Sequence, residues 1–225
     1  MTGVTVDLMI PIKSLSRAKT RLRGAADDGI GEATAHARLA LALSRDTVAA
    51  ARAARSVRRV VAITSDPEVT AVLTADGVPV LADLPQHDLN GALAYGAEVL
   101  RTNGPQQPVA ALQADLPALR PDELDQALHQ AIAAFRIGRA MRAYCADAPG
   151  VGTTLLVCAP WVALEPRFGG HSAEAHENAG ALPLIGDWPG LRRDVDTPSD
   201  LWHAERIGLG TATRDALRKA ARPLR

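Results

Sequence analysis

The chain has 225 residues, and 47% of them are hydrophobic, which is enough for a large α/β domain with a sizeable core. Its 25 Lys and Arg residues are balanced by 25 Asp and Glu residues, and this balance excludes a long-range field that favours nucleic acid or a membrane surface. The N-terminus reaches Asp7 before any long apolar stretch, and no run of about 18 apolar residues occurs, so neither a signal peptide nor a membrane span is expected. A cytoplasmic protein is therefore predicted.

Short β-rich runs alternate with longer helical patterns along the chain. In chain order we expect a strand at 4–11, a helix at 32–54, a strand at 57–64, a helix at 67–75, a strand at 78–81, a helix at 89–102, a strand at 109–114, a helix at 121–134, strands at 142–146 and 153–159, a helix at 173–178, a strand at 191–195 and a helix at 197–207. This alternation predicts an α/β fold, a three-layer sandwich with a mostly parallel central sheet, in a single domain over residues 1–225. Residues 142–190 break the rhythm and are expected to form an inserted hairpin and lid over the substrate.

Three aspartates lie where predicted strands end. Asp115 follows the strand at 109–114, and Asp194 and Asp196 lie at the end of the strand at 191–195. Ligands of open α/β sheets bind beyond such strand ends. Three carboxylates gathered there would suit Mg²⁺, which completes its shell with water and substrate phosphates, although a solvated turn also explains an Asp-x-Asp sequence. Zinc is disfavoured because no His or Cys cluster has the spacing of zinc ligands.

Four cations follow the first predicted strand within nine residues: Lys13, Arg17, Lys19 and Arg21. A loop at this position faces the same crevice as the aspartates, and its charges would neutralise a triphosphate. A solvated basic loop is the alternative. The phosphate-binding loop of P-loop NTPases is excluded because no GxxxxGK[ST] sequence occurs.

Two glycine-rich turns lie in the predicted hairpin and lid, at 150–154 and at 166–172. The second leads into the helix predicted at 173–178, where backbone N–H groups could bind an anion. Ser172 would then be both the N-cap of this helix and a phosphate ligand. A plain capped turn explains the same sequence equally well.

Several polar side chains have an ordinary structural interpretation beside a functional one. The amide of Asn90, at the start of a predicted helix, could contact a base or a ribose, or could cap the helix. His171 and His176 are expected on the surface rather than as ligands. Cys145 and Cys158 lie in apolar runs and are expected to be buried reduced thiols, with a disulfide as the alternative.

Six sequence strings occur in an order that resembles a known family: IPIKSLSRAKTRL, DLNGAL, LQADLPAL, GVGTTLL, PRFGGHSAEAH and WPGLRRDVDTPSDL. The chain resembles the guanylyltransferases of coenzyme F-420 biosynthesis, which act on phosphoenolpyruvate or 2-phospho-L-lactate, over residues 5–210. The resemblance implies the nucleotidyltransferase fold of the molybdenum-cofactor guanylyltransferases, which is like that of nucleotide-diphospho-sugar transferases. The GGxSxRMG loop of the molybdopterin enzymes is absent, which disfavours that activity.

The resemblance also implies roles for individual residues. They are metal binding by Asp115, Asp194 and Asp196, acceptor binding by Thr153, Gly169 and Ser172, nucleotide binding by Lys13, Lys19, Arg21 and Asn90, and catalysis by Lys19, Arg21 and Asp115. Family members often have GTGT where this chain has Gly150-Val151-Gly152-Thr153, so the threonine at the ligand position is kept.

The implied reaction joins GTP to phosphoenolpyruvate with Mg²⁺ as cofactor and releases pyrophosphate. Phosphoenolpyruvate is favoured as the acceptor because the Ala- and Arg-rich composition fits actinobacterial relatives, while 2-phospho-L-lactate and 3-phosphoglycerate stay open. A downstream deazaflavin transferase would be the functional partner. The rival interpretations are a nucleotide-sugar glycosyltransferase, in which Asp-x-Asp also holds a metal, and a non-catalytic protein that binds nucleotide for another enzyme.

Overall fold

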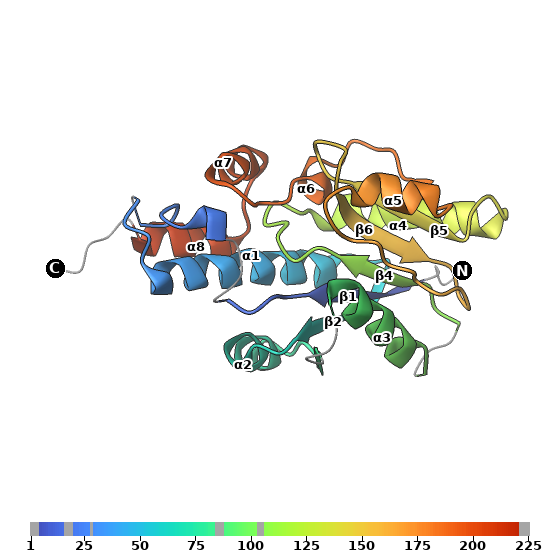
Figure 1. Ribbon diagram of the computed structural model, residues 1–225, viewed down its shortest axis with the longest axis horizontal. Coiled ribbons are helices and arrows are strands. Elements are labelled where there is room, and N and C mark those ends of the chain that lie inside the picture. Colours follow the sequence, from blue (N-terminus) through green and yellow to red (C-terminus); the bar gives the residue numbers. More distant parts are fainter. Residues whose placement is uncertain (1–4, 16–19, 28, 84–87, 103–105, 221–225) are drawn as a thin grey trace.

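The computed structural model describes residues 5–15, 20–27, 29–83, 88–102 and 106–220 of the chain. Within these ranges a seven-stranded sheet runs through the molecule in the order β3-β2-β1-β4-β6-β5-β7 (Figure 1). Its strands are β1 (Val6–Pro11), β2 (Val57–Thr64), β3 (Val80–Ala82), β4 (Val109–Leu112), β5 (Arg142–Ala146), β6 (Thr153–Cys158) and β7 (Leu182–Pro183). Strands β3, β2, β1 and β4 are parallel, and β6 runs antiparallel to both β4 and β5.

Helices cover both faces of this sheet. They are α1 (Ala33–Ala53), α2 (Pro67–Ala75), α3 (Leu89–Thr102), α4 (Pro121–Arg136), α5 (Ser172–Asn178), α6 (Pro189–Arg192), α7 (Pro198–Ile207) and α8 (Thr211–Ala220), with a 3-10 turn η1 (Thr20–Leu22). Successive side chains of a strand point to opposite faces, so Leu8 and Ile10 pack with α1 and α4, while Met9 packs with α3. The predicted three-layer α/β sandwich with a mostly parallel sheet is confirmed.

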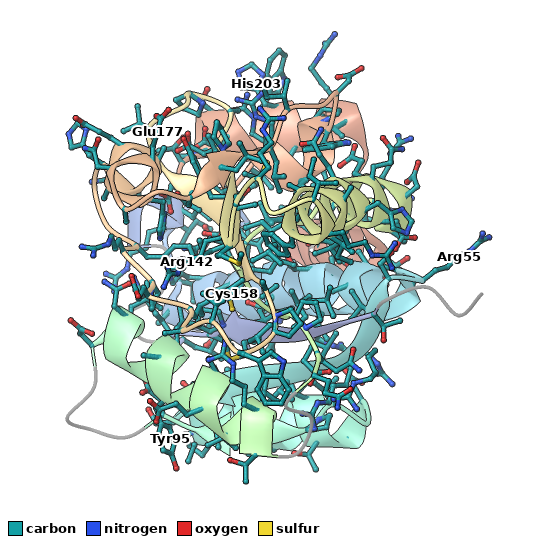
Figure 2. The ribbon with its side chains drawn as sticks, turned by 90° about the vertical axis from the view of Figure 1, so that its right-hand side faces the viewer. Arg55, Tyr95, Arg142, Cys158, Glu177 and His203 are labelled. Carbon is teal, nitrogen blue, oxygen red and sulfur yellow. The ribbon has the colours of Figure 1, made fainter. Side chains whose placement is uncertain are left out.

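The central sheet is apolar on both faces, and both cysteines of the chain lie in its strands, Cys145 in β5 and Cys158 in β6. Figure 2 shows Cys158 of β6 between the layers, whereas Arg55 points out of the molecule. Cys145 and Cys158 are both buried and free, which confirms the prediction of reduced thiols. Burial raises the pKa of the Cys145 thiol to about 11, so it stays protonated and unreactive at neutral pH.

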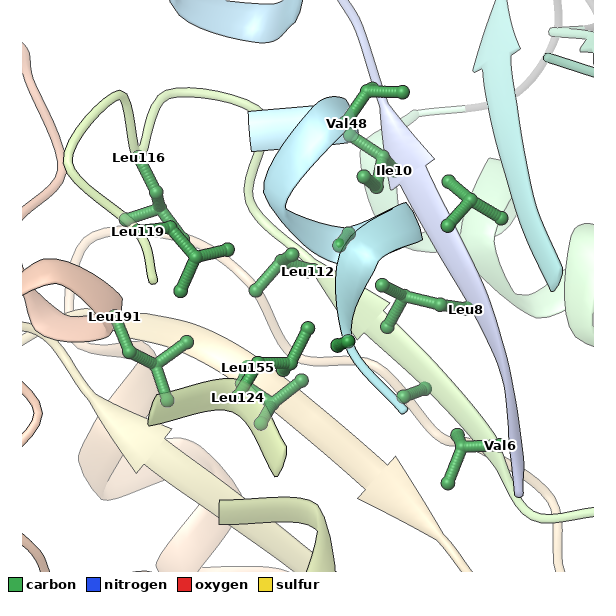
Figure 3. Packing of buried hydrophobic residues seen from close by; sticks show 14 of the residues in the cluster. Val6, Leu8, Ile10, Val48, Leu112, Leu116, Leu119, Leu124, Leu155 and Leu191 are labelled. Atoms are coloured by element: carbon green, nitrogen blue, oxygen red, sulfur yellow. The ribbon is translucent and has the colours of Figure 1, made fainter. Parts of the chain in front are cut away.

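The largest core cluster reaches from β1 to segments that lie beyond the sheet. Val6, Leu8 and Ile10 of β1 belong to the same cluster as Leu116, which follows β4, and Leu191 of α6 (Figure 3). Leu116 comes directly after Asp115, and Leu191 comes three residues before Asp194. Burial of these two leucines therefore fixes the chain on either side of the predicted site.

Most predicted elements have the expected positions. The strand at 57–64, the helices at 67–75 and 89–102 and the strand at 142–146 match in both bounds, and most other ends shift by one or two residues. Asp66 caps α2 by accepting hydrogen bonds from the N–H groups of Glu68 (2.9 Å) and Val69 (3.1 Å). The expected hairpin at 142–159 extends the central sheet itself, because β6 pairs directly with β4.

The prediction of a strand at 191–195 is wrong. The chain there forms the short helix α6, which begins at Pro189, and residues 193–195 follow without regular structure. Proline at the first helical position favours such a turn. The buried carboxylate of Glu123 on α4 accepts hydrogen bonds from the N–H groups of Gly190 (3.3 Å) and Leu191 (2.8 Å), and thereby caps it. Asp194 and Asp196 therefore follow a capped helical turn, not a strand.

No helix within the described ranges is long and apolar enough to cross a membrane.

Gly190 allows α6 to approach the loop after β4. A Cβ atom at this position would lie 2.2 Å from the carbonyl oxygen of Ala118. Because backbone must move to relieve such a contact, we expect Gly190→Ala to lower the free energy of unfolding by about 2 kcal/mol, measured by urea titration. At Gly170 a Cβ would meet no heavy atom within 4 Å, so Gly170→Ala is the matched control and should leave the midpoint nearly unchanged. Equal midpoints for the two variants would contradict the close approach.

Candidate active site

The backbone around Asp115 is held by a side chain of α1. Thr47 is fully buried, and its hydroxyl donates to the carbonyl oxygen of Ala114 at 3.0 Å and accepts from the N–H of Leu116 at 2.9 Å. These are the two neighbours of Asp115, whose own side chain is half-buried. A single hydroxyl therefore fixes the direction in which the chain leaves β4.

The segment that carries the other two aspartates lies next to Asp115. The N–H of Val195 donates to the carbonyl oxygen of Asp115 at 3.0 Å, and the Val195 side chain is fully buried. Asp194 is half-buried and Asp196 is exposed. The structure thus brings together two stretches that are 79 residues apart in sequence, as counted between Asp115 and Asp194.

The chain after Asp196 turns at once into α7. Thr197 and Asp200 form a capping box, in which the Asp200 carboxylate accepts from the N–H groups of Thr197 (2.9 Å) and Asp196 (3.3 Å). The guanidinium of Arg193 lies 3.7 Å from the same carboxylate. Asp200 therefore orders the backbone on which Asp196 is carried.

A cavity of about 130 Å³ opens beyond the carboxyl ends of β1 and β4. Typical small-molecule sites enclose roughly 300–1,000 Å³, so the described residues surround a volume suited to a phosphate group, not to a whole nucleotide. Its lining comprises Pro11, Ile12, Lys13, Leu15, Ala40, Leu43, Ser44, Leu89, Gln113, Ala114, Asp115 and Asp196. Lys13, Asp115 and Asp196 thus share one cavity, and Asp194 is not among its lining residues.

The predicted basic loop is only partly described. Lys13 is exposed and lines the cavity. Arg21 lies in η1, is also exposed and does not line the cavity. Arg17 and Lys19 lie outside the described residues, so their predicted contact with the triphosphate stays a prediction.

Asp66 ties the start of this loop to α2. Besides capping α2, its carboxylate accepts from the N–H of Leu15 at 2.9 Å. Burial alone would raise the pKa of Asp66, but the hydrogen bonds from Leu15, Val69 and Glu68 outweigh it and lower the pKa below its usual value. The carboxylate that holds the loop is therefore ionised at neutral pH.

The three aspartates do not form a closed metal cage. Among the described residues, which include all three, no group of three His, Cys, Asp or Glu side chains is close enough to hold a metal ion. Asp115 and Asp196 nevertheless line the same cavity. Their hard oxygen donors fit Mg²⁺, because Mg²⁺ is usually held by one or two carboxylates, with waters and substrate phosphates completing its shell. A third ligand at Asp194 stays a prediction.

Thr153 is the first residue of β6 and lies beside the end of β4, because β6 pairs with β4 in antiparallel orientation. The N–H of Gln113 donates to the carbonyl oxygen of Thr154 at 2.8 Å, and Thr153 is buried. The glycine-rich turn before it is ordered by Asp147, whose carboxylate accepts from the N–H groups of Val151 and Gly152, both at 2.8 Å. Thr153 is therefore close in the sheet to the strand that precedes Asp115.

The lid loop, residues 166–172, is fixed to α3 by Asn90. The Asn90 amide donates to the carbonyl oxygen of Phe168 at 3.0 Å and accepts from the Phe168 N–H at 2.8 Å. The cap of α3 comes from Asp88, which accepts from the N–H of Gly91 at 2.7 Å. Asn90 thus positions the lid loop in this structure, and its predicted contact with the nucleotide stays a prediction.

Ser172 is not the N-cap that the sequence predicted. It is the first residue of α5, the N-cap position is occupied by His171, and the His171 side chain makes no capping hydrogen bond within the part of the chain that the structure describes. Ser172 is only 3% exposed, so its hydroxyl faces the interior, while Gly169 is exposed with a φ of +156° that suits glycine. Of the predicted acceptor residues, Gly169 and Ser172 therefore lie in the lid loop and Thr153 lies at the start of β6, and none of the three is among the lining residues of the cavity beside Asp115.

His176 is the residue that sequence reasoning missed most clearly. It was expected on the surface and is only 1% exposed, whereas His171 is exposed as expected. One ring nitrogen lies 2.9 Å from the Thr153 hydroxyl, and the other accepts from the N–H of Arg167 at 2.9 Å. Burial lowers the pKa of His176 to about 4. The only sequence signal was its spacing, three residues after Ala173 on a short helix that buries one face.

The comparison with known sequences finds closely similar proteins. The chain is 48% identical to the phosphoenolpyruvate guanylyltransferase of Salinispora arenicola over 206 residues, which are 92% of this chain and 90% of that protein. It is 47% identical to that of Geodermatophilus obscurus (96% and 95% covered) and 46% identical to that of Streptomyces coelicolor (92% and 92%). No family model matches the chain.

Solved structures of similar fold are more distant in sequence. A nucleotide-diphospho-sugar transferase from Desulfovibrio desulfuricans superposes with a TM-score of 0.69 at 17% identity, over 97% of this chain and 96% of that one. A nucleotidyl transferase from Methanothermobacter superposes with a TM-score of 0.58 at 16% identity, over 96% and 100%. These likenesses support the predicted nucleotide-diphospho-sugar-transferase-like fold.

The hydroxyl of Thr47 can be tested separately from its volume. Thr47→Val keeps the shape and leaves the buried N–H of Leu116 without a partner, so we expect a loss of about 1–3 kcal/mol in the free energy of unfolding. Thr47→Ser keeps the hydroxyl and loses only a methyl group, which costs about 1 kcal/mol. Urea titration should rank wild type above Ser and Ser above Val. A valine variant as stable as wild type would show that the hydroxyl does not hold this segment.

Proposed function

This chain belongs to the phosphoenolpyruvate guanylyltransferase family, and we propose that it transfers GMP from GTP to phosphoenolpyruvate with release of pyrophosphate. The observation that best supports a nucleotidyl transfer is one cavity that presents the cation of Lys13 together with the carboxylates of Asp115 and Asp196. This cavity lies beyond the carboxyl ends of parallel strands, where open α/β sheets bind their ligands.

The reaction requires the protein to bring two anions together, the phosphate of the acceptor and the triphosphate of GTP. An oxygen of the acceptor's phosphate attacks the α-phosphorus of GTP, a new P–O bond forms, and the bond to the β-phosphate oxygen breaks to release pyrophosphate. The attacking phosphate is already largely ionised, since the second pKa of a phosphate monoester is about 6. No general base is needed, so catalysis consists of positioning and charge neutralisation.

The residues at the end of β4 have a defined part in this scheme. We assign Lys13 to the phosphates of GTP, together with Lys19 and Arg21 from the basic loop. Asp115 and Asp196, with Asp194 as a third candidate, would hold Mg²⁺. When bound, this ion would neutralise phosphate charge and increase the electrophilicity of the α-phosphorus.

The acceptor is assigned to the other side of the same strand end. Thr153 at the start of β6, together with Gly169 and Ser172 of the lid loop, would bind the phosphate and carboxylate of the acid. Thr153 and Ser172 are buried in this structure, so we expect the lid loop to adjust when the acid binds. A phosphorylated three-carbon acid is the substrate class, and phosphoenolpyruvate is the member that we propose.

Two other functions are weighed against this one. A nucleotide-sugar glycosyltransferase shares the fold, but it would transfer a sugar and release no pyrophosphate. A non-catalytic nucleotide-binding protein would bind GTP without turnover.

We further propose that the product serves coenzyme F-420 biosynthesis and passes to a deazaflavin transferase, which would be the functional partner.

The acceptor can be identified by a pyrophosphate-release assay. Purified protein with GTP and Mg²⁺ is given phosphoenolpyruvate, 2-phospho-L-lactate or 3-phosphoglycerate, and a coupled deazaflavin transferase removes a labile product. We expect the highest kcat/KM with phosphoenolpyruvate, and a much lower value when ATP replaces GTP. Faster turnover with another acid would change the acceptor, and sugar transfer without pyrophosphate would overturn the proposed function.

Asp196 offers a test of the acidic site that does not disturb folding. Its side chain is exposed, so Asp196→Ala should keep the urea midpoint of wild type. If it holds the metal, the variant should lose about 10²-fold or more in turnover, by comparison with the loss of other charge-stabilising groups. Asp187→Ala, at another exposed aspartate outside the cavity lining, is the control and should keep wild-type turnover. Wild-type activity in the Asp196 variant would remove this residue from the site.

A further inference from the structure

His176 joins two segments that the proposed function assigns to the acceptor. Its ring lies 2.9 Å from the hydroxyl of Thr153 through Nδ1, and Nε2 lies 2.9 Å from the N–H of Arg167. The imidazole is only 1% exposed and packs edge-on against Phe168, with ring centroids 5.3 Å apart, while Tyr144 lies at 6.1 Å.

The position of the proton on His176 follows from the backbone. A peptide N–H can only donate, so Nε2, facing the N–H of Arg167, must carry a lone pair. A neutral imidazole has one N–H, which must then be on Nδ1. Nδ1 therefore donates to the Thr153 hydroxyl oxygen at 2.9 Å, and that hydroxyl cannot donate back. The Thr153 hydrogen is left for another acceptor.

We propose that His176 is a positioning residue for the acceptor: in its Nδ1–H form it orients the Thr153 hydroxyl so that this hydroxyl donates to an anionic oxygen of the phosphorylated acid. This inference rests on the proposed function, which places Thr153 in the acceptor site. His176 acts through Thr153 and does not touch the reacting atoms. A hydrogen bond from a neutral donor to a charged oxygen is strong enough to affect acceptor affinity about tenfold or more.

The surroundings keep the ring in this state. Burial is the main reason that the pKa of His176 falls to about 4, the nearby Arg167 guanidinium also disfavours a second positive charge, and the carbonyl oxygen of Ser172 opposes them by favouring an N–H. Protonation would also place a hydrogen on Nε2 against the N–H of Arg167. The ring therefore stays neutral at neutral pH, and the Thr153 hydroxyl keeps one orientation.

A second clamp holds the next peptide of the lid loop. Asn90 binds both the N–H and the carbonyl oxygen of Phe168, so the peptide groups of Arg167 and Phe168 are fixed in succession by two side chains. Gly169 follows directly. His176 thus links the orientation of Thr153 to the position of the loop that carries the other proposed acceptor residues.

Two amide substitutions separate the two contacts of the ring. In His176→Gln the terminal amide reaches the position of Nε2 and can still accept from Arg167, but nothing donates to Thr153. In His176→Asn the amide reaches the position of Nδ1 and can still donate to Thr153, but Arg167 loses its partner. We expect the KM for phosphoenolpyruvate to rise about tenfold in the Gln variant and less in the Asn variant, with the KM for GTP within about twofold of wild type in both. The opposite order of the two variants, or equal rises for both substrates, would overturn the proposal.

A double-mutant cycle shows whether His176 acts through Thr153. Thr153→Val removes the hydroxyl, so adding His176→Gln to it should change the acceptor KM by less than about twofold. Additive effects of the two substitutions would mean that His176 acts by another route and would contradict the inference. Urea midpoints of all variants control for loss of folding.

The tautomer can be read without any turnover. In protein labelled with ¹⁵N-histidine, long-range ¹H–¹⁵N spectra at pH 7 should show one buried histidine with a protonated Nδ1 and an unprotonated Nε2, and this signal should be absent in His176→Gln. A protonated Nε2 would overturn the inference even if the enzyme is active. An inactive wild-type protein with the expected spectrum would instead count against the proposed function, because the orientation of Thr153 would stand without the reaction.

Discussion

The end of β4 imposes the constraint on which the site depends. Strand β4 is buried, and where it leaves the sheet its peptide groups must find hydrogen-bond partners elsewhere. Three different parts of the chain supply them: the N–H of Gln113 donates to β6, the N–H of Leu116 donates to Thr47 on α1, and the carbonyl oxygen of Asp115 accepts from Val195. Two of these parts, β6 and the segment around Val195, carry Thr153 and the two other aspartates. The hydrogen bonds that satisfy the peptide groups after β4 thus also bring the proposed site residues together.

The loops around this point are held mainly by side chains that bind backbone N–H groups. Asp66 holds the start of the basic loop, Glu123 holds α6, Asp147 holds the turn before β6, and Asn90 and His176 hold the lid loop. Each such bond, if removed with the N–H left buried, costs about 1–3 kcal/mol. A loop without a strand partner can therefore be as well ordered as the sheet beside it, which a site that must place two anions needs.

What the sequence predicted well depends on local pattern. Short β-rich runs and turn residues located the parallel strands, and Asp115 lies three residues beyond the end of one of them, at Leu112. Lys13 follows β1 in the same way and lines the same cavity. Both are side chains whose position is set by the strand that precedes them, so a single stretch of sequence contains the necessary information.

What the sequence did not predict depends on partners that are distant along the chain. The apolar residues of 191–195 resemble a strand, but the carboxylate that caps α6 comes from Glu123 on α4. In the sequence His176 resembles a surface residue, but in the structure its two ring nitrogens contact the Thr153 hydroxyl and the N–H of Arg167. In the sequence the Asn90 amide resembles a nucleotide ligand or a helix cap, but in the structure it binds the N–H and the carbonyl oxygen of Phe168. In each case a polar side chain is satisfied by tertiary structure, which has no periodic signature.

The charges of the cavity bear on the proposed metal. Among the lining residues that the structure describes, Lys13 contributes one formal positive charge and Asp115 and Asp196 contribute two formal negative charges, so this part of the lining is net negative before any ligand enters. Two unit charges 4 Å apart interact by about 4 kcal/mol at an effective dielectric constant of 20, so a polyphosphate would be repelled by these carboxylates unless further positive charge is present. The cations of the basic loop can contribute part of it. We propose that a divalent ion bound by the carboxylates would reverse the sign of this interaction, which is the role that Mg²⁺ would have in a phosphate-sized cavity with two aspartates.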